Sequence, residues 1–153
     1  MSTDLMWGVL EVGLPEFATP HEKGADRLPI AANRIRPYLR RLLEMLEAGS
    51  SDFVIEGEVF LPSDVVTLAK SFRLRSVFLV RNQATPPQLV EKPGNNPWLA
   101  GASCELLEAV AAEVRTYSSS ITQQCAELKL PYVELDRDFE AAMQAAQAQL
   151  GLA

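Results

Sequence analysis

A carboxylate closes a short apolar run in the first half of the chain. In the segment SSDFVIEGEVFLPSD, residues 50–64, the run Phe53–Ile55 passes directly into Glu56 and Gly57. Functional side chains of parallel α/β sheets lie where the strands end, because helix N-termini converge there. Glu56 could therefore take part in chemistry, or it could be a solvated residue or a cap of a helix that begins at Pro62. Its position alone leaves these interpretations open.

The same rule singles out other polar residues that follow apolar runs. Arg81 ends the run SVFLVR and Asn82 follows it, and Asp136–Asp138 follow PYVEL. A second group is basic, and its members lie beside a long loop: Arg34, Arg36, Arg40 and Arg41. These arginines are typical of a solvated helix face, and they also suit an anionic substrate. A hydroxyl-rich patch from Thr116 to Thr122 predicts a local bend in a helix or, alternatively, a contact with phosphate.

Several kinds of site are excluded by counting residues. His21 is the only histidine, so a histidine-based triad or a multi-histidine metal site cannot form. Cys104 and Cys125 lie on one predicted helix, where 21 positions span about 31 Å, which is too far for a disulfide. We therefore expect two free structural thiols and a reducing, cytoplasmic location.

Composition predicts an ordinary globular chain. Its 153 residues, of which 48% are hydrophobic and 22% charged, correspond to a single domain, residues 1–153. The net charge of −6 offers no basic excess for nucleic acid, so we expect no nucleic-acid partner. No apolar run approaches the roughly 20 residues that span a bilayer, and the first residues lack the features of a signal peptide. We therefore expect no membrane partner.

The elements that must position these residues alternate between helices and strands. Periodicity predicts helices from Ser2 or Thr3 to about Val12, from Ile30 to Ala48 with Pro37 at its start or at a kink, from Pro62, through Leu107–Leu128, and after Asp136–Asp138. Strands are predicted at Phe53–Glu56, Ser76–Arg81 and Pro131–Leu135, with loops at Gly13–Pro29 and Thr85–Trp98. This order predicts an α/β fold in three layers, with a parallel sheet flanked by helices.

Short motifs along the chain resemble a known family. These are STDL at Ser2–Leu5, the loop LPEF, FVIEG at Phe53–Gly57 followed by LP, VFLV at Val77–Val80, PYVEL at Pro131–Leu135 and DFE at Asp138–Glu140. Together they resemble the small P-loop kinases, the nucleoside, shikimate and phosphoglycerate kinase-like group of P-loop NTPases. The resemblance extends from Ser2 to about Leu150.

The resemblance implies a role for each candidate residue. Glu56 would orient a magnesium ion or its bound water, and Asp4 would contact the acceptor or act as its general base. Arg34, Arg36 and Arg40 would bind the small-molecule acceptor. Residues 82–102 would form a lid, with Lys92 and Arg115 as its basic residues. Asp136 and Arg137 would lie near the adenine of ATP, which the family uses together with magnesium.

One required motif is absent from the chain. No glycine is followed by lysine, so GxxxxGK[ST], the loop that holds the phosphates, is missing. We expect a chain that lacks the central N-terminal strand and this loop, and that is inactive alone. The strands at Phe53–Glu56 and Ser76–Arg81 would flank the missing strand, and an open sheet edge could lead to self-association. The alternative is a non-catalytic α/β module that binds a partner or an anionic ligand.

Overall fold

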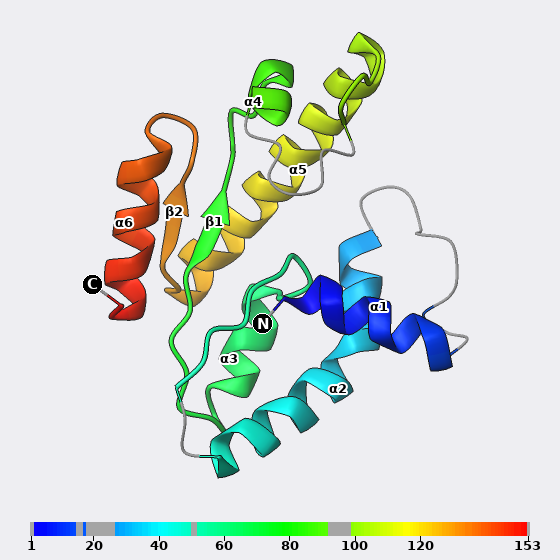
Figure 1. Cartoon of the computed structure of the whole chain (residues 1–153). Coiled ribbons are helices and arrows are strands. Elements are labelled where there is room, and N and C mark those ends of the chain that lie inside the picture. The colour runs from blue at the N-terminus through cyan, green and yellow to red at the C-terminus, as the bar shows by residue number, and fades with distance from the viewer. Residues whose placement is uncertain (1, 15–16, 18–26, 50–51, 92–98, 153) are drawn as a thin grey trace. The chain divides into compact units, whose positions relative to one another are not determined.

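The computed structural model divides the chain into two compact units, Met1–Leu74 and Arg75–Ala153. It describes residues 2–14, 17, 27–49, 52–91 and 99–152 (Figure 1). Each unit has a cluster of buried apolar residues of its own. The sequence-based prediction of a single domain over residues 1–153 stays a prediction.

Most of the described part of the first unit is helical. It contains α1 (Thr3–Gly13), α2 (Arg27–Ala48) and α3 (Pro62–Leu68). Its core is built around Phe17, Ile35, Leu39 and Val59, against which Trp7 and Tyr38 pack. The Phe17 ring meets those of Trp7 and Tyr38 edge to face, with centroid distances of 4.7 and 5.4 Å. The predicted first helix is confirmed, with one further residue at its end.

Two prolines affect the helices of this unit differently. Pro62 is the first residue of α3, as predicted, because the N–H that proline lacks has no helical partner there. Pro37 lies inside α2, so it does not start that helix. It has no N–H to donate to the Asn33 carbonyl, and the α2 ribbon changes direction along its length (Figure 1).

The predicted strand Phe53–Glu56 is wrong. Among the described residues, the segment forms one isolated parallel bridge, between Glu56 and Ser2, and no longer ladder. Phe53 and Val54 are 42% and 47% exposed, so the apolar run is not a buried strand. The physical reason is that α1 begins at Thr3, directly after Ser2. The helical backbone from Thr3 onward cannot continue the strand pairing beyond the pair of Ser2 and Glu56.

The second unit contains a small parallel sheet. In its described residues β1 (Phe78–Val80) pairs with β2 (Tyr132–Glu134) in parallel, with Leu79 opposite Val133. Helix α5 (Cys104–Leu128) packs on β1 and α6 (Phe139–Leu150) on β2, and Figure 1 shows the strands between these helices. The fold is therefore mostly helical α/β with a small two-stranded parallel sheet, and two of the predicted strands are confirmed in shorter form.

The proline-rich segment after β1 is partly helical, contrary to the predicted loop. Residues Pro86–Glu91 form α4. The reason is a capping box, in which Thr85 precedes the helix and the Gln88 Oε1 accepts from the Thr85 N–H at 2.9 Å. Pro86 follows the cap directly, where a proline begins a helix rather than breaking it. The remainder of the predicted loop, residues 92–98, lies outside the described residues.

The two cysteines lie on α5, as predicted, and both are free. Cys104 is exposed, whereas Cys125 packs with Val80 and Ile121, and burial raises the pKa of the Cys125 thiol.

Among the described residues, no helix combines the length and apolarity that crossing a bilayer requires.

Candidate functional site at the strand ends

Polar side chains gather where β1 and β2 end. The Asn82 Nδ2 donates to the Glu134 Oε1 at 2.8 Å and to the Thr122 Oγ1 at 3.1 Å. The backbone N–H of Gln83 donates to the Asp136 Oδ2 at 3.0 Å. The structure thus brings together Asn82 and Asp136, which sequence reasoning had placed at one edge of a parallel sheet. We call this group the strand-end cluster, and its members are Arg81, Asn82, Gln83, Ser118, Thr122, Glu134 and Asp136.

Hydroxyl groups of α5 complete the strand-end cluster. The buried Ser118 accepts a hydrogen bond from the Arg81 backbone N–H at 2.9 Å, and Thr122 lies one helical turn further along. Both belong to the hydroxyl-rich patch for which a bend or a phosphate contact was predicted. The i,i+4 spacing of Ser118 and Thr122 was the signal for a shared face toward the sheet, and it was missed.

Asp136 accepts hydrogen bonds with both its backbone carbonyl and its side chain. Its carbonyl oxygen accepts from the Gln88 Nε2 at 3.4 Å, while its Oδ2 accepts from Gln83. The Oδ1 is buried and accepts no hydrogen bond from the described residues. A buried acceptor without a partner costs about 1–3 kcal/mol. Arg137, the other predicted nucleotide contact, is exposed in the bend before α6.

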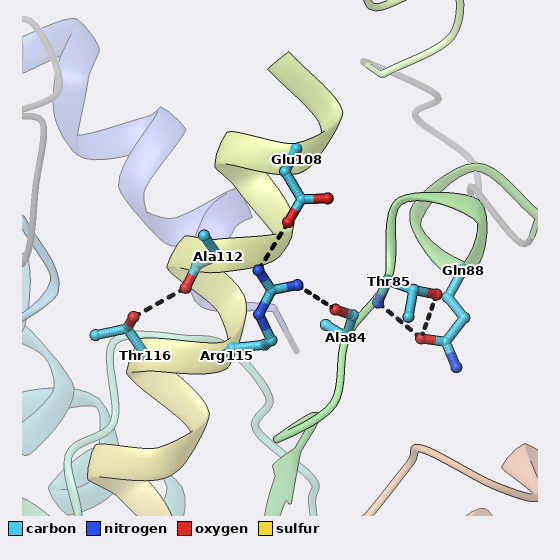
Figure 2. A network of polar contacts seen from close by, with 7 residues as sticks. All are labelled: Ala84, Thr85, Gln88, Glu108, Ala112, Arg115 and Thr116. Atoms are coloured by element: carbon cyan, nitrogen blue, oxygen red, sulfur yellow. Dashed lines mark hydrogen bonds and ion pairs between the residues drawn. The ribbon is translucent and has the colours of Figure 1, made fainter. Parts of the chain in front are cut away.

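Arg115, predicted as a lid residue, holds the chain that leaves β1. Its Nη1 donates to the Ala84 carbonyl oxygen at 2.7 Å, and its Nη2 forms an ion pair with Glu108 at 2.8 Å (Figure 2). Ala84 is fully buried, so the guanidinium of Arg115 supplies a hydrogen bond to a carbonyl oxygen of a residue that water does not reach. Lys92, the other predicted lid residue, lies outside the described residues.

Glu56 is exposed, and its backbone contacts the first residue of α1. Its carbonyl oxygen accepts from the Thr3 N–H at 2.8 Å. Gly57 has φ +153°, and a Cβ added there would overlap the Thr3 side chain, so only glycine allows this approach. Glu56 is not the cap of α3, because the N-cap is Leu61 and makes no side-chain capping bond. Asp4 belongs to α1, and its side chain lies outside what the structure describes.

Ion pairs join several arginines of α2 to acids of the first unit. Arg36 forms an ion pair with Asp64 at 2.6 Å, and Asp64 is only 10% exposed. Arg40 and Arg41 both contact Glu44, at 3.5 and 3.1 Å. The predicted substrate-binding residues Arg36 and Arg40 therefore already face carboxylates. Arg34, the third of them, is half-buried on the same helix. Neither Asp64 nor Glu44 was singled out from the sequence.

ATP and magnesium do not fit the residues of this chain alone. Magnesium bound to a nucleotide is held by one or two carboxylates together with the phosphates, and the loop that would hold those phosphates is absent from the sequence. Within the described ranges, no group of three or more histidine, cysteine or acidic residues could hold a metal ion.

No protein-family model, curated protein or solved structure matches the chain.

Proposed function

We propose that this chain is the acceptor-binding and lid-bearing portion of an ATP-dependent small-molecule phosphotransferase of the P-loop kind, and that it is inactive without the phosphate-binding strand and loop. The proposal includes a three-layer parallel sheet in the complete enzyme. The observation that carries it is the pairing pattern of the two segments that would flank a central strand. Glu56 pairs in parallel with Ser2 inside the first unit, and β1 pairs in parallel with β2 inside the second.

The division of the chain agrees with this proposal. The boundary between the units falls at Leu74 and Arg75, between the Glu56 segment and β1. The resemblance places the missing central strand between these same two segments. A chain that lacks the strand on which both segments would pair is expected to divide at this point, because backbone ladders join the halves of a parallel sheet.

Hydrogen-bond geometry supports a further strand beside β1. The Phe78 N–H donates to Pro131 and the Val80 carbonyl accepts from Leu135, so both residues face β2. Backbone groups of alternate residues point to opposite edges of a parallel strand, so those of Leu79 point to the other edge. This edge would pair with the central strand of the complete enzyme, and self-association through it stays a prediction.

In the complete enzyme the candidate residues would act in the roles that the resemblance implies. Glu56 would orient magnesium or its water, and Asp4 would serve the acceptor. Arg34, Arg36 and Arg40 would bind an anionic acceptor, for which Arg36 would have to exchange Asp64 for substrate. We expect Glu56→Gln in the complete enzyme to lower turnover about a hundredfold while the fold is retained. Unchanged turnover would remove Glu56 from the mechanism.

The genomic sequence upstream of Met1 gives the first test. An in-frame segment that encodes a strand followed by GxxxxGK[ST] would support the proposal. A stop codon directly before Met1, without such a motif, would contradict it.

A second candidate is a non-catalytic α/β module. The specific observation in its favour is that polar groups at the predicted sites already have partners within the chain, as Arg36 has Asp64 and Asn82 has Glu134. A module of this kind would bind a partner or an anionic ligand without turnover. The upstream sequence separates the two candidates, because only the phosphotransferase requires the phosphate loop.

A further inference from the structure

Ser118 is a polar residue on the buried face of α5. The other buried members of this face are apolar: Ala111, Ile121 and Cys125. Ile121 and Cys125 pack with Val80, so the face lies against β1. A hydroxyl at such a position costs free energy unless a hydrogen bond compensates for its burial. For Ser118 this bond is the one that its Oγ accepts from the Arg81 N–H at 2.9 Å.

The bond to Ser118 lies on the edge of β1 that faces away from β2. Phe78 and Val80 bond to β2, and backbone groups of alternate residues point to opposite edges, so the N–H groups of Leu79 and Arg81 belong to the other edge. Among the described residues, the N–H and the carbonyl oxygen of Leu79 have no hydrogen-bond partner, whereas the Arg81 N–H donates to Ser118. This edge is therefore open at Leu79 and closed at Arg81.

The closure at Arg81 limits how far another strand can pair with β1. A parallel neighbour would accept from the Leu79 N–H and donate to the Leu79 carbonyl oxygen. Its next inward carbonyl would need the Arg81 N–H, which Ser118 already holds. Pairing therefore has to end at Leu79, and the neighbouring chain has to leave the sheet beside Arg81, where the strand-end cluster begins.

We propose that Ser118 is a positioning residue, which ends the ladder between β1 and the central strand of the complete enzyme and so fixes where the phosphate-binding loop starts. The inference rests on the proposed function, because it takes the central strand as the occupant of this edge. A parallel strand that continues into a loop fits an edge closed at its carboxyl end. Two copies paired antiparallel about Leu79 fit it less well, because the Val77 carbonyl of one copy would need the Arg81 N–H of the other.

Amide hydrogen exchange of the 153-residue chain, followed by NMR, tests the closing bond. The Arg81 N–H should be protected, and the Leu79 N–H should exchange quickly in dilute and in concentrated protein alike. In Ser118→Ala we expect exchange at Arg81 to become about tenfold faster, as the loss of one hydrogen bond predicts. The N–H of Leu135, which donates to Val80, is the reference for the sheet and should not change. Ser119→Ala, at an exposed position of α5, is the matched control and should leave Arg81 as it is.

Two results with this chain would overturn the proposal. Unchanged exchange at Arg81 in Ser118→Ala would show that Ser118 does not hold this N–H. Protection of Leu79 that grows with protein concentration would show that a second copy, and not a central strand, pairs with the edge.

The chain extended by the residues encoded in frame upstream of Met1 tests where the ladder ends. Scalar couplings across hydrogen bonds, measured by NMR, should join the Leu79 N–H to a carbonyl of the upstream strand and should not join the Arg81 N–H to that strand. In the same protein Ser118→Ala should weaken the binding of magnesium and ATP about tenfold, as the loss of one hydrogen bond to phosphate predicts. Ser118→Thr keeps the hydroxyl and should restore the binding.

The outcomes separate this inference from the proposed function. A coupling from the Arg81 N–H to the upstream strand, or ATP binding that Ser118→Ala leaves unchanged, would overturn the role of Ser118 while the phosphotransferase stands. No coupling at Leu79 together with no ATP binding would contradict the proposed function itself, and with it this role for Ser118.

Discussion

The contact between Gly57 and Thr3 gives a sharp prediction for Gly57→Ala. A Cβ at position 57 would overlap the Thr3 Oγ1 and also meet its Cβ and Cγ2. Thr3 cannot move aside easily, because its side chain is 1% exposed and its N–H is bonded to Glu56. The φ of +153° adds strain of about 1–3 kcal/mol for a residue other than glycine. We expect Gly57→Ala to destabilise the first unit by about 3 kcal/mol.

Urea unfolding provides the assay. Trp7 packs against Phe17 in the core of the first unit, so its fluorescence, measured in a Trp98→Phe background, reports that unit. The midpoint should fall while the slope against urea is kept. Gly13→Ala is the matched control, because among the described residues no atom beyond its chain neighbours and its own helix backbone lies within 4 Å of the added Cβ. It should change stability by less than about 0.5 kcal/mol.

A double-mutant cycle identifies the cause. Thr3→Ala removes the Oγ1 and Cγ2 that Gly57→Ala would meet, so the double variant should recover about 1 kcal/mol relative to additivity. A Gly57→Ala chain as stable as Gly13→Ala would refute the proposed approach of Gly57 to α1. A cycle without coupling would assign the loss to backbone strain alone.

Three further predictions follow from single side chains. Thr3→Val should stabilise the first unit by about 1 kcal/mol in the same urea assay, because it removes a buried hydroxyl oxygen that has no hydrogen-bond partner among the described residues; a loss of stability would contradict that. Asp64→Asn, which breaks the ion pair with Arg36, should cost about 1 kcal/mol, whereas Glu44→Gln on the exposed face should cost less than about 0.5 kcal/mol; equal effects would contradict the difference in burial. Burial raises the pKa of the Cys125 thiol, so the exposed Cys104 should be alkylated first, and faster alkylation of Cys125 at pH 8 would contradict this. The raised pKa also makes the contribution of Cys125 to stability complete below the ordinary thiol pKa, and this contribution should be lost as pH rises toward the folded-state pKa.

Local signals made much of the second unit predictable. Asp138 caps α6 by accepting from the Ala141 N–H at 3.1 Å, and apolar periodicity outlined α5. The almost continuous apolar run SVFLVR and the short run PYVEL correctly indicated the strands β1 and β2, which pair in parallel. The same logic placed Asn82 and Asp136 at one edge before the structure showed their contacts.

Features that depend on distant partners could not be read from the sequence. The run at Phe53 resembles a strand, but a strand requires a neighbour, and in the part of the chain that the structure describes Glu56 pairs only with Ser2. The ion pair of Arg36 with Asp64 joins two helices, and the hydrogen bond of Ser118 reaches the backbone of Arg81. The ion pair of Arg36 with Asp64 arises from tertiary packing and has no signal in the spacing of residues along the chain. The i,i+4 spacing of Ser118 and Thr122 indicates a shared face of α5, but it does not identify Arg81 as the partner of that face.

Calorimetry with magnesium and ATP tests the central proposal most directly. Two proteins would be compared: the chain of 153 residues and the same chain extended by the residues encoded in frame upstream of Met1. The proposal predicts no binding tighter than about millimolar for the chain alone, and roughly micromolar binding for an extended chain that carries GxxxxGK[ST]. Micromolar binding by the chain alone, or no binding by an extended chain with that loop, would contradict it.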